Sequence, residues 1–307
     1  MGADAVHRKA LLIGASGQVG AQILTQLGSD RCIAACRNPS EPDWAAVDLA
    51  QLASSPALAD QLLNAFAPIA VYCVGGMTDV ERCESEPDLA MAVNCDGPRA
   101  LAAASSASSI PFVYFSTEYV FDGRNGPYNE TSQVNPISVY GRSKWLGECA
   151  ILQVHPDALI IRTTVVYGMD PGGKNFLYTL RRVLQEGRTL RVPCDQISTP
   201  TYNRDLAAAT IRLVESGYTG IIHIAGPEVM SRLHFAVQAA SALGFDTNKI
   251  AGVPTSLLGQ RAERPLSAGL LTDKLREVLP DFHMQTLEFS LQELSTYDFS
   301  STTSCAA

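Results

Sequence analysis

The segment ALLIGASGQVG, at residues 10–20, is the most informative part of the sequence. It opens with an apolar run, which predicts a buried β-strand, and residues 19–27 have the periodicity of a helix. Glycines in such a strand-turn-helix unit permit a tight turn, a close approach of the backbone to a pyrophosphate, and close packing of helix on strand. The glycines here are Gly14, Gly17 and Gly20. They predict a dinucleotide site at the N-terminus of the helix, and a glycine turn with a purely structural role is the alternative.

Apolar runs and helical patterns continue to alternate along the first half of the chain. Four further apolar runs predict buried strands: Cys32–Cys36, Ile69–Val74, Phe112–Ser116 and Leu159–Arg162. Crossover helices are predicted between them at residues 57–65, 86–107 and 139–153. Repeated strand-helix-strand units indicate an α/β fold with a doubly wound parallel sheet of the Rossmann type. Ligands of such sheets bind at the carboxyl ends of the strands.

The pattern changes after Arg162, where a smaller C-terminal lobe is predicted to begin. Residues 171–192 carry a loop, a helix and a short strand, whereas residues 205–225 predict a helix and a strand that return to the first sheet. We therefore predict a dinucleotide-binding domain of residues 1–166 and 203–226, a substrate-binding lobe of residues 167–202 and 227–294, and a flexible, Ser- and Thr-rich tail of residues 295–307.

The composition argues against several classes of partner. The 307 residues carry a net charge of -8 and no block of Lys or Arg, so binding to nucleic acid or to an anionic membrane is not expected. The five histidines are scattered and the eight cysteines form no CxxC pair, so we expect no metal site. The apolar run at residues 10–13 is too short for a signal or membrane helix, which favours a cytoplasmic location. A homo-oligomer and a partner enzyme both stay open.

Arg37 directly follows the second predicted strand, where an acidic residue would accept the ribose hydroxyls of NAD. A guanidinium instead forms paired hydrogen bonds with a phosphate. We therefore predict a preference for NADP(H), with NAD(H) as the alternative cofactor. A solvated arginine in a turn is the structural alternative.

Tyr140 and Lys144 stand four residues apart in a predicted helix, so their side chains emerge on one face. A free phenol has a pKa of about 10, and a nearby ammonium group lowers it toward the range in which the phenol exchanges a proton with an alkoxide. Thr117 follows the predicted strand before this helix, and its hydroxyl is suited to bind a carbonyl oxygen. These three residues are the candidate catalytic set.

The glycine spacing and this set of three resemble the extended type of short-chain dehydrogenase/reductase. Within that class, longer strings resemble the dTDP-4-dehydrorhamnose reductase family over about Lys9 to Leu294, among them STEYVFDG (116–123), PYNE (127–130), GKNF (173–176) and TPTY (199–202). The resemblance implies that Tyr140 is the general acid in a reduction and that Thr117 orients the carbonyl. It also implies that Lys144 lowers the pKa of Tyr140 and holds the nicotinamide ribose.

The remaining site residues follow from the same resemblance and from the glycine loop. The predicted cofactor-binding residues are Gly14, Ser16, Gly17, Gln18, Val19, Gly20, Arg37, Asp48, Leu49, Cys73, Val74, Gly75, Tyr140, Lys144 and Thr163. The predicted substrate-binding residues are Thr78, Glu118, Asn175, Phe176 and Arg264. Three of these have a structural alternative: Asp48 in a surface turn, Asn175 as a helix cap and Arg264 as a solvated side chain.

The sequence departs from the family at positions that bear on the substrate. Gly75 and Gly76 stand where the family usually has alanines, Glu118 replaces an Asp, and Val165 replaces a Trp. Three hypotheses for the function therefore remain. The first is an NADP-dependent reductase of a keto group on a nucleotide-linked deoxysugar. The second is a non-catalytic, NADP-binding regulatory subunit, because the chain also resembles the β regulatory subunit of methionine adenosyltransferase. The third is a reductase of another carbonyl compound.

Overall fold

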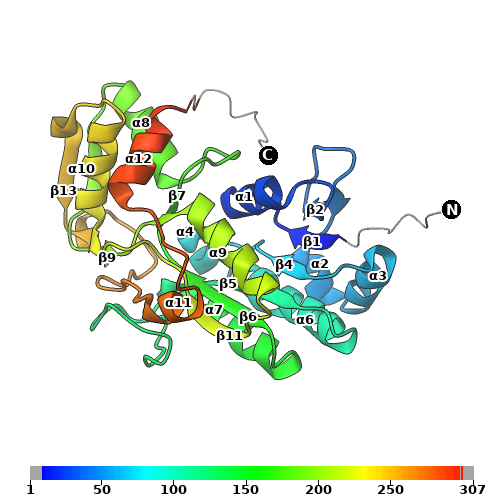
Figure 1. The fold of residues 1–307 in the computed structure, drawn as a ribbon. Helices are drawn as coiled ribbons and strands as arrows, with labels where there is room; N and C mark the ends of the chain where they lie inside the picture. The colour runs from blue at the N-terminus through cyan, green and yellow to red at the C-terminus, as the bar shows by residue number, and fades with distance from the viewer. Residues whose placement is uncertain (1–8, 298, 300–307) are drawn as a thin grey trace.

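The computed structural model describes residues 9–297 and 299 of the chain. Its centre is a parallel sheet with the strand order β11-β6-β5-β4-β1-β2-β3 (Figure 1). The strands are β1 (Ala10–Ile13), β2 (Cys32–Cys36), β3 (Ala45–Ala46), β4 (Val71–Cys73), β5 (Phe112–Thr117), β6 (Leu159–Thr163) and β11 (Gly220–His223). The order changes direction between β1 and β4, which is where doubly wound sheets bind ligands. The predicted fold class is confirmed.

Helices cover both faces of this sheet, which explains why its strands read as continuous apolar runs. On one face lie α1 (Gln18–Leu27), α9 (Asn203–Glu215) and α11 (Asp273–Val278). On the other lie α2 (Leu49–Ser54), α3 (Ala57–Phe66), α6 (Gly97–Ala107) and α7 (Val139–Val154). Alternate residues of β1 serve the two faces: Leu12 packs under α1, and Leu11 packs on the opposite side. Both cores hold the carboxyl edge of the sheet rigid.

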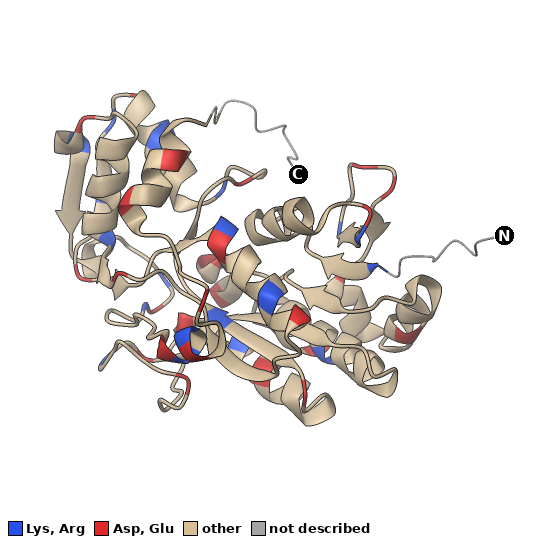
Figure 2. Ribbon diagram, viewed as in Figure 1, with Lys and Arg blue, Asp and Glu red and all other residues tan. Residues whose placement is uncertain are grey.

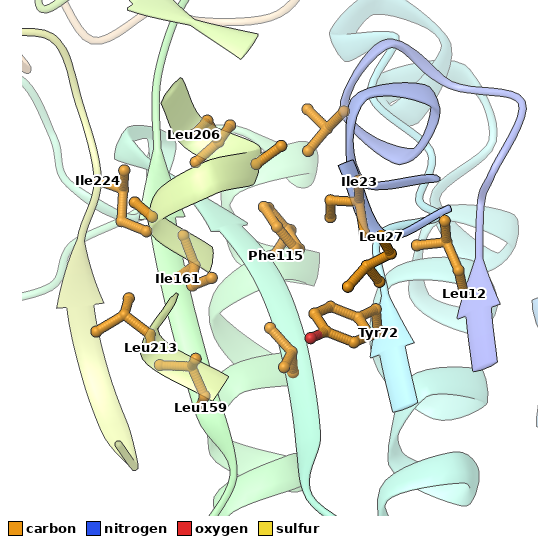
Figure 3. Close-up of a cluster of buried hydrophobic side chains, with 14 of the residues drawn as sticks. Leu12, Ile23, Leu27, Tyr72, Phe115, Leu159, Ile161, Leu206, Leu213 and Ile224 are labelled. Carbon is orange, nitrogen blue, oxygen red and sulfur yellow. The ribbon is translucent and has the colours of Figure 1, made fainter. Parts of the chain in front are cut away.

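Figure 3 shows the core under α1 and α9, in which Ile23 and Leu206 of these helices meet Phe115 and Ile161 of the strands. Leu275 of α11 belongs to the same core, because the short helix covers β11 with its apolar side. The sequence assigned residues 227–294 to the smaller lobe, whereas α11, which lies within that range, packs on the first sheet. The rest of the domain division stays a prediction.

The helix predicted over residues 86–107 is interrupted. The structure has α4 (Val80–Ser85), α5 (Pro87–Met91), a π-helical turn η1 (Ala92–Asp96) and then α6. Pro98 has no backbone N–H to continue a regular helix, and Gly97 lies so close to α2 that a Cβ there would be 2.1 Å from the Leu49 carbonyl oxygen. The π-helical turn places the Asn94 side chain in the interior, and such turns are frequent at functional sites.

The smaller lobe has a core of its own, at the left of Figure 1. Its helices are α8 (Phe176–Gln185), α10 (Arg232–Ala242) and α12 (Leu287–Ser295). Its strands form three pairs: β8 (Leu190–Pro193) with β13 (Ile250–Val253), β7 (Val166–Tyr167) with β10 (Thr201–Tyr202), and β9 (Ile197–Ser198) with β12 (Met230–Ser231). Short 3-10 turns occur at η2 (Glu118–Val120), η3 (Thr247–Lys249) and η4 (Thr255–Leu257).

The tail predicted over residues 295–307 is only partly described. Phe299 is buried in the smaller lobe, with its ring 5.2 Å from that of Tyr178, so this residue differs from the expectation of a flexible tail. Residues 298 and 300–307 lie outside the described part of the chain.

The described residues show no concentrated charge or membrane feature. Figure 2 shows basic and acidic residues spread over both lobes. No helix within residues 9–297 has the length and apolarity needed to cross a membrane. In the same range, no three His, Cys, Asp or Glu side chains gather as a metal-binding group.

Candidate active site

A cavity of about 1220 Å³ opens at the carboxyl ends of β1, β4, β5 and β6. A pocket for a single small ligand has roughly 300–1000 Å³, so this cavity has room for two ligands side by side. Most residues singled out from the sequence line it: Gly14, Ser16, Gly17, Gln18, Val19, Arg37, Asp48, Leu49, Val74, Gly75, Thr78, Thr117, Glu118, Tyr140, Lys144, Thr163, Phe176 and Arg264. The fold therefore brings both predicted sets to one place.

Gly20, Cys73 and Asn175 lie behind the cavity wall rather than on it. Cys73 is fully buried in β4, where burial raises the pKa of its thiol to about 12. Asn175 caps α8: its Oδ1 accepts a hydrogen bond from the backbone N–H of Leu177 at 3.0 Å. Its Nδ2 donates to Gln18 Oε1 at 3.0 Å, which ties α8 to the glycine loop. For Asn175 the structure supports the capping role instead of a contact with substrate.

Each of the three loop positions favours glycine for a different structural reason. Gly14 has a φ of +93°, which favours glycine, and a Cβ there would lie 2.5 Å from Gly75 N. A Cβ on Gly20 would lie 2.1 Å from the Gly14 carbonyl oxygen, so only glycine lets α1 pack this closely on the loop. Gly17 faces the cavity, and a Cβ there would meet Gly14 O only at 3.4 Å. Space next to Gly17 is therefore left for something other than protein.

The N-terminus of α1 is built to receive an anion. The first backbone N–H groups of a helix have no partner within it. Gly17, the residue before α1, has no side chain that could cap them. They lie at the cavity, together with the positive end of the helix dipole. This arrangement, with the space beside Gly17, fits the pyrophosphate of a dinucleotide.

Arg37 and Asp48 lie at the adenosine end of the cavity. Arg37 is exposed at its rim and forms no ion pair with any residue in the described ranges, so its guanidinium is available to a phosphate. Asp48 caps α2, with Oδ1 accepting a hydrogen bond from Ala50 N at 2.9 Å. It therefore has a structural role whether or not it contacts an adenosine.

Tyr140 and Thr117 meet inside the cavity. Tyr140 lies in the first turn of α7 and Thr117 is the last residue of β5. Burial raises the pKa of the Tyr140 phenol, and a hydrogen bond with the Thr117 side chain lowers it in part. The ring of Tyr119 packs edge-on against that of Tyr140, with 5.3 Å between the ring centres. The phenol thus keeps its proton at neutral pH and is held next to a hydroxyl.

Lys144 lies one helical turn further along α7 and is buried. Its Nζ donates a hydrogen bond to the Phe115 carbonyl oxygen at 2.8 Å, and burial lowers its pKa to about 8. The ammonium also lies over the ring of Tyr114, 4.6 Å from its centre. A lowered pKa of Tyr140, implied by the resemblance, stays a prediction, because burial raises that pKa and the hydrogen bond of Lys144 goes to the backbone of β5.

Asn94 is a site residue that the sequence did not single out. It is fully buried, and its amide bonds both main-chain groups of Met77, at 2.8 Å to N and 3.0 Å to O. It also donates to Ser143 Oγ at 3.0 Å, in the turn between Tyr140 and Lys144. Asn94 therefore fixes the loop after β4 against α7. Only the π-helical turn, which no local pattern announces, puts it there.

Glu148 and Arg162 form a buried ion pair behind the catalytic residues, with 2.6 Å between Oε2 and the guanidinium. The other oxygen of Glu148 accepts a hydrogen bond from the hydroxyl of Ser116. Ser116 and Arg162 are neighbours in the register of β5 and β6. The pair thus fastens α7 to the two strands whose ends carry Thr117 and Thr163.

The other end of the cavity carries Glu118, Arg232 and Arg264. Burial raises the pKa of the Glu118 carboxyl to about 8, while contacts with Thr164 and the charge of Arg232 lower it. Arg264 is paired with Glu81 at 2.7 Å, so it is not the solvated side chain of the structural alternative. Arg232, which the sequence analysis missed, stacks on the ring of Phe176 at 4.3 Å and has no ion pair within the described ranges. A free guanidinium thus faces the cavity.

A glycine loop at the switch point of a parallel sheet, with Tyr140 and Lys144 on one buried helix face, defines an extended short-chain dehydrogenase/reductase. The model of the family described as RmlD substrate binding domain matches residues 8–296, nearly the whole chain. The chain belongs to this family.

Individual relatives agree with this assignment. The chain is 32% identical over 294 residues to the spore coat polysaccharide biosynthesis protein SpsK of Bacillus subtilis, covering 94% of this chain and 98% of the relative. It is 32% identical over 266 residues to the dTDP-4-dehydrorhamnose reductase of Mycolicibacterium smegmatis, covering 85% and 77%. A solved structure of the Bacillus anthracis dTDP-4-dehydrorhamnose reductase in complex with NADP superposes with a TM-score of 0.82 and 29% identity, covering 94% of this chain and 98% of that one.

Proposed function

We propose that this protein reduces the keto group of a nucleotide-linked 4-dehydro-deoxysugar, of the dTDP-4-dehydrorhamnose kind, with NADPH. The observation that carries the proposal is the position of Tyr140 and Thr117, whose side chains meet inside a cavity large enough for a cofactor and a second ligand. The names of the relatives support the choice of substrate and cofactor.

The glycine loop and Arg37 suit the two ends of the cofactor. The free N–H groups of α1 hold the pyrophosphate, and the unpaired guanidinium of Arg37 holds a 2′-phosphate. NADPH, when bound, supplies the hydride. Leu49 and Val74 line the same cavity and give it apolar wall surface.

The protein supplies the proton and the orientation of the carbonyl. The Tyr140 phenol gives its proton to the oxygen of the carbonyl group as that oxygen gains negative charge. Thr117 donates a hydrogen bond to the same oxygen, which favours the charge developed in the transition state. Lys144, held by Phe115 O, keeps a positive charge within one helical turn of the phenol. That charge stabilises the phenolate left behind.

Arg232 and Arg264 suit the diphosphate of the substrate. Arg264 is already neutralised by Glu81, whereas Arg232 is free to pair with a phosphate oxygen. Arg232 is therefore the residue that we assign to the diphosphate. Phe176, which stacks against its guanidinium, holds it toward the cavity.

The test is the oxidation of NADPH by the purified protein with a panel of nucleotide-linked 4-keto sugars. We expect turnover with a dTDP-linked sugar and a loss of at least about 100-fold in Tyr140→Phe, since proton transfer by a positioned side chain contributes about that much. Absence of turnover with every sugar of the panel, by protein that binds NADPH, would contradict the proposal and favour a regulatory NADP-binding protein.

A further inference from the structure

A loop between the two lobes forms part of the cavity wall. Residues 254–265, which we call the strap, follow β13 of the smaller lobe and precede α11, which packs on the sheet (Figure 1). Leu258, Gln260, Arg264 and Pro265 of the strap line the cavity. The strap therefore connects the lobes beside the space that a ligand would fill, and how firmly it is held bears on how a ligand enters and leaves.

The first end of the strap is held by the smaller lobe. Thr255 N donates hydrogen bonds to both carboxylate oxygens of Asp195 at 3.0 Å, and Thr255 Oγ1 donates to Oδ1 at 2.6 Å. The amide of Gln196 donates to the same hydroxyl at 3.0 Å. Arg191 Nη2 donates to the Leu257 carbonyl oxygen at 2.9 Å. These contacts fix residues 255–257 on the loop that follows β8.

The middle of the strap has little support. Leu257 is 61% exposed, and neither Gly259 nor Gln260 forms a hydrogen bond with any of the described residues. Gly259 has a φ of +66°, and a Cβ on it would have no atom within 4 Å. Segments with few contacts and exposed backbone open at a low cost in free energy. The position of the strap therefore depends on what holds its second end.

One carboxylate of α4, that of Glu81, holds the second end. Its Oε2 accepts a hydrogen bond from Arg261 N at 2.8 Å. Its Oε1 accepts from Ala262 N at 3.4 Å and from the guanidinium of Arg264 at 2.7 Å. The Glu81 side chain is 42% exposed, so water competes for these contacts and they can break and form again. Glu81 thus ties the strap reversibly to the dinucleotide-binding half of the molecule.

The helix that carries Glu81 is itself fixed next to the catalytic residues. Glu84, one turn further along α4, accepts a hydrogen bond from Val139 N at 2.8 Å. Val139 begins α7 and directly precedes Tyr140. Glu81 therefore holds the strap against a fixed part of the active site, while it makes no contact with Tyr140 itself.

We propose that Glu81 is a positioning residue: it keeps the strap closed beside the bound substrate and slows the exchange of that ligand. The inference rests on the proposed function, because the ligand concerned is the nucleotide-linked sugar. Glu81 acts on this ligand only through the strap, so its loss should leave proton transfer by Tyr140 unchanged. A strap that opens more often should instead release the ligand sooner, since such segments gate the exchange of ligands in many enzymes.

The experiment measures how fast a sugar nucleotide leaves the protein. The probe is dTDP-rhamnose, bound to NADP-saturated protein and followed by stopped-flow displacement. We expect koff to rise at least about fivefold in Glu81→Ala, since one hydrogen bond typically changes an equilibrium constant by roughly two- to tenfold. Glu81→Gln should show a smaller rise, because its amide oxygen still accepts from a strap N–H. Glu288→Gln, an equal loss of charge at an exposed position of α12, should leave koff unchanged.

Ionic strength separates the strap from the charge of Arg264, which loses its partner in Glu81→Ala. A freed guanidinium attracts a diphosphate and speeds association, and salt screens this effect. The faster release should persist at about 0.5 M KCl, where KM should also rise while the single-turnover rate stays within about twofold of the wild type. A koff that is unchanged or lower at both ionic strengths would overturn the proposal. So would an equal loss in KM and in the single-turnover rate, which indicates a merely structural role.

Hydrogen exchange of the ligand-free protein keeps this test separate from the proposed function. Relative to their intrinsic rates, the amides of Arg261 and Ala262 should exchange at least about tenfold more slowly than those of Gly259 and Gln260. In Glu81→Ala the four rates should be similar. If no sugar nucleotide binds, the proposed function fails, and the exchange rates still decide whether Glu81 holds the strap. Four similar rates in the wild type would overturn that role.

Discussion

Gly17 and Gly20 give the clearest prediction at the scale of single residues. An alanine should destabilise the fold at Gly20 and weaken NADPH binding at Gly17. A methyl group on Gly20 meets the Gly14 carbonyl oxygen at 2.1 Å, so Gly20→Ala should destabilise the fold by about 2 kcal/mol. A methyl group on Gly17 meets it only at 3.4 Å, so Gly17→Ala should fold normally but bind NADPH at least about tenfold more weakly. Thermal unfolding and NADPH titration measure the two effects. Equal changes in stability and in NADPH affinity in the two variants would contradict the loop geometry.

Glu118 should make stability depend on pH. Its pKa is 4.5 without the fold and about 8 within it, because burial disfavours the carboxylate. A raised pKa means that its contribution to stability is complete below the unfolded value and is lost as pH rises through the folded one. Glu118→Gln removes this loss. The stability of Glu118→Gln relative to the wild type should therefore grow between about pH 5 and about pH 8, by roughly 4 kcal/mol, and then level off. Urea unfolding across pH measures it, and a constant difference would contradict the burial of Glu118.

Arg37 should set the choice between cofactors. Arg37→Asp replaces a partner of the 2′-phosphate by an acid, so the ratio of NADPH to NADH affinity should fall by at least about tenfold. Arg99→Asp, an exposed change on α6, is the matched control and should leave the ratio unchanged. An unchanged ratio in Arg37→Asp would remove Arg37 from the cofactor site.

At the scale of elements, the Glu148–Arg162 pair joins α7 to β5 and β6. Glu148→Gln or Arg162→Met leaves an uncompensated buried charge, which typically costs about 3–5 kcal/mol. The double variant should be less destabilised than the sum of the two singles, because neither charge is then left alone. Unfolding free energies of the four proteins measure the coupling. Additive effects would mean that the pair is not what holds α7.

Elements with strong local patterns could be predicted from the sequence, and those fixed by long-range contacts could not. The runs at β1 and β2 are apolar on both faces, and their predicted bounds agree with the structure. The π-helical turn at η1 depends on Gly97 packing against Leu49, which lies in another element. Its consequence, a buried Asn94 at the active site, was therefore missed.

For the molecule as a whole, the two ends of the cavity differ in how far local sequence patterns could predict their residues. Thr117, Tyr140 and Lys144 were predicted because their spacing and the strand before them carry the signal. Arg232 was missed because only the fold of the smaller lobe, to which α10 belongs, brings it to the cavity and within electrostatic reach of Glu118. The contacts of Asn175 with Gln18 and of Arg264 with Glu81 likewise join segments far apart in the chain. Local patterns therefore predict more of the residues that line the glycine-loop end of the cavity than of those that line its other end.

The central claim, hydride transfer to a sugar carbonyl beside Tyr140, has one direct test. Protein is incubated with NADPH that carries deuterium at the transferable position of its nicotinamide, and with a dTDP-linked 4-keto sugar. The account predicts a product with one deuterium at the former carbonyl carbon, detected by mass spectrometry and NMR, and almost none with Tyr140→Phe. A protein that binds both ligands yet leaves the sugar unlabelled, or that labels it equally well without the Tyr140 phenol, would contradict the account.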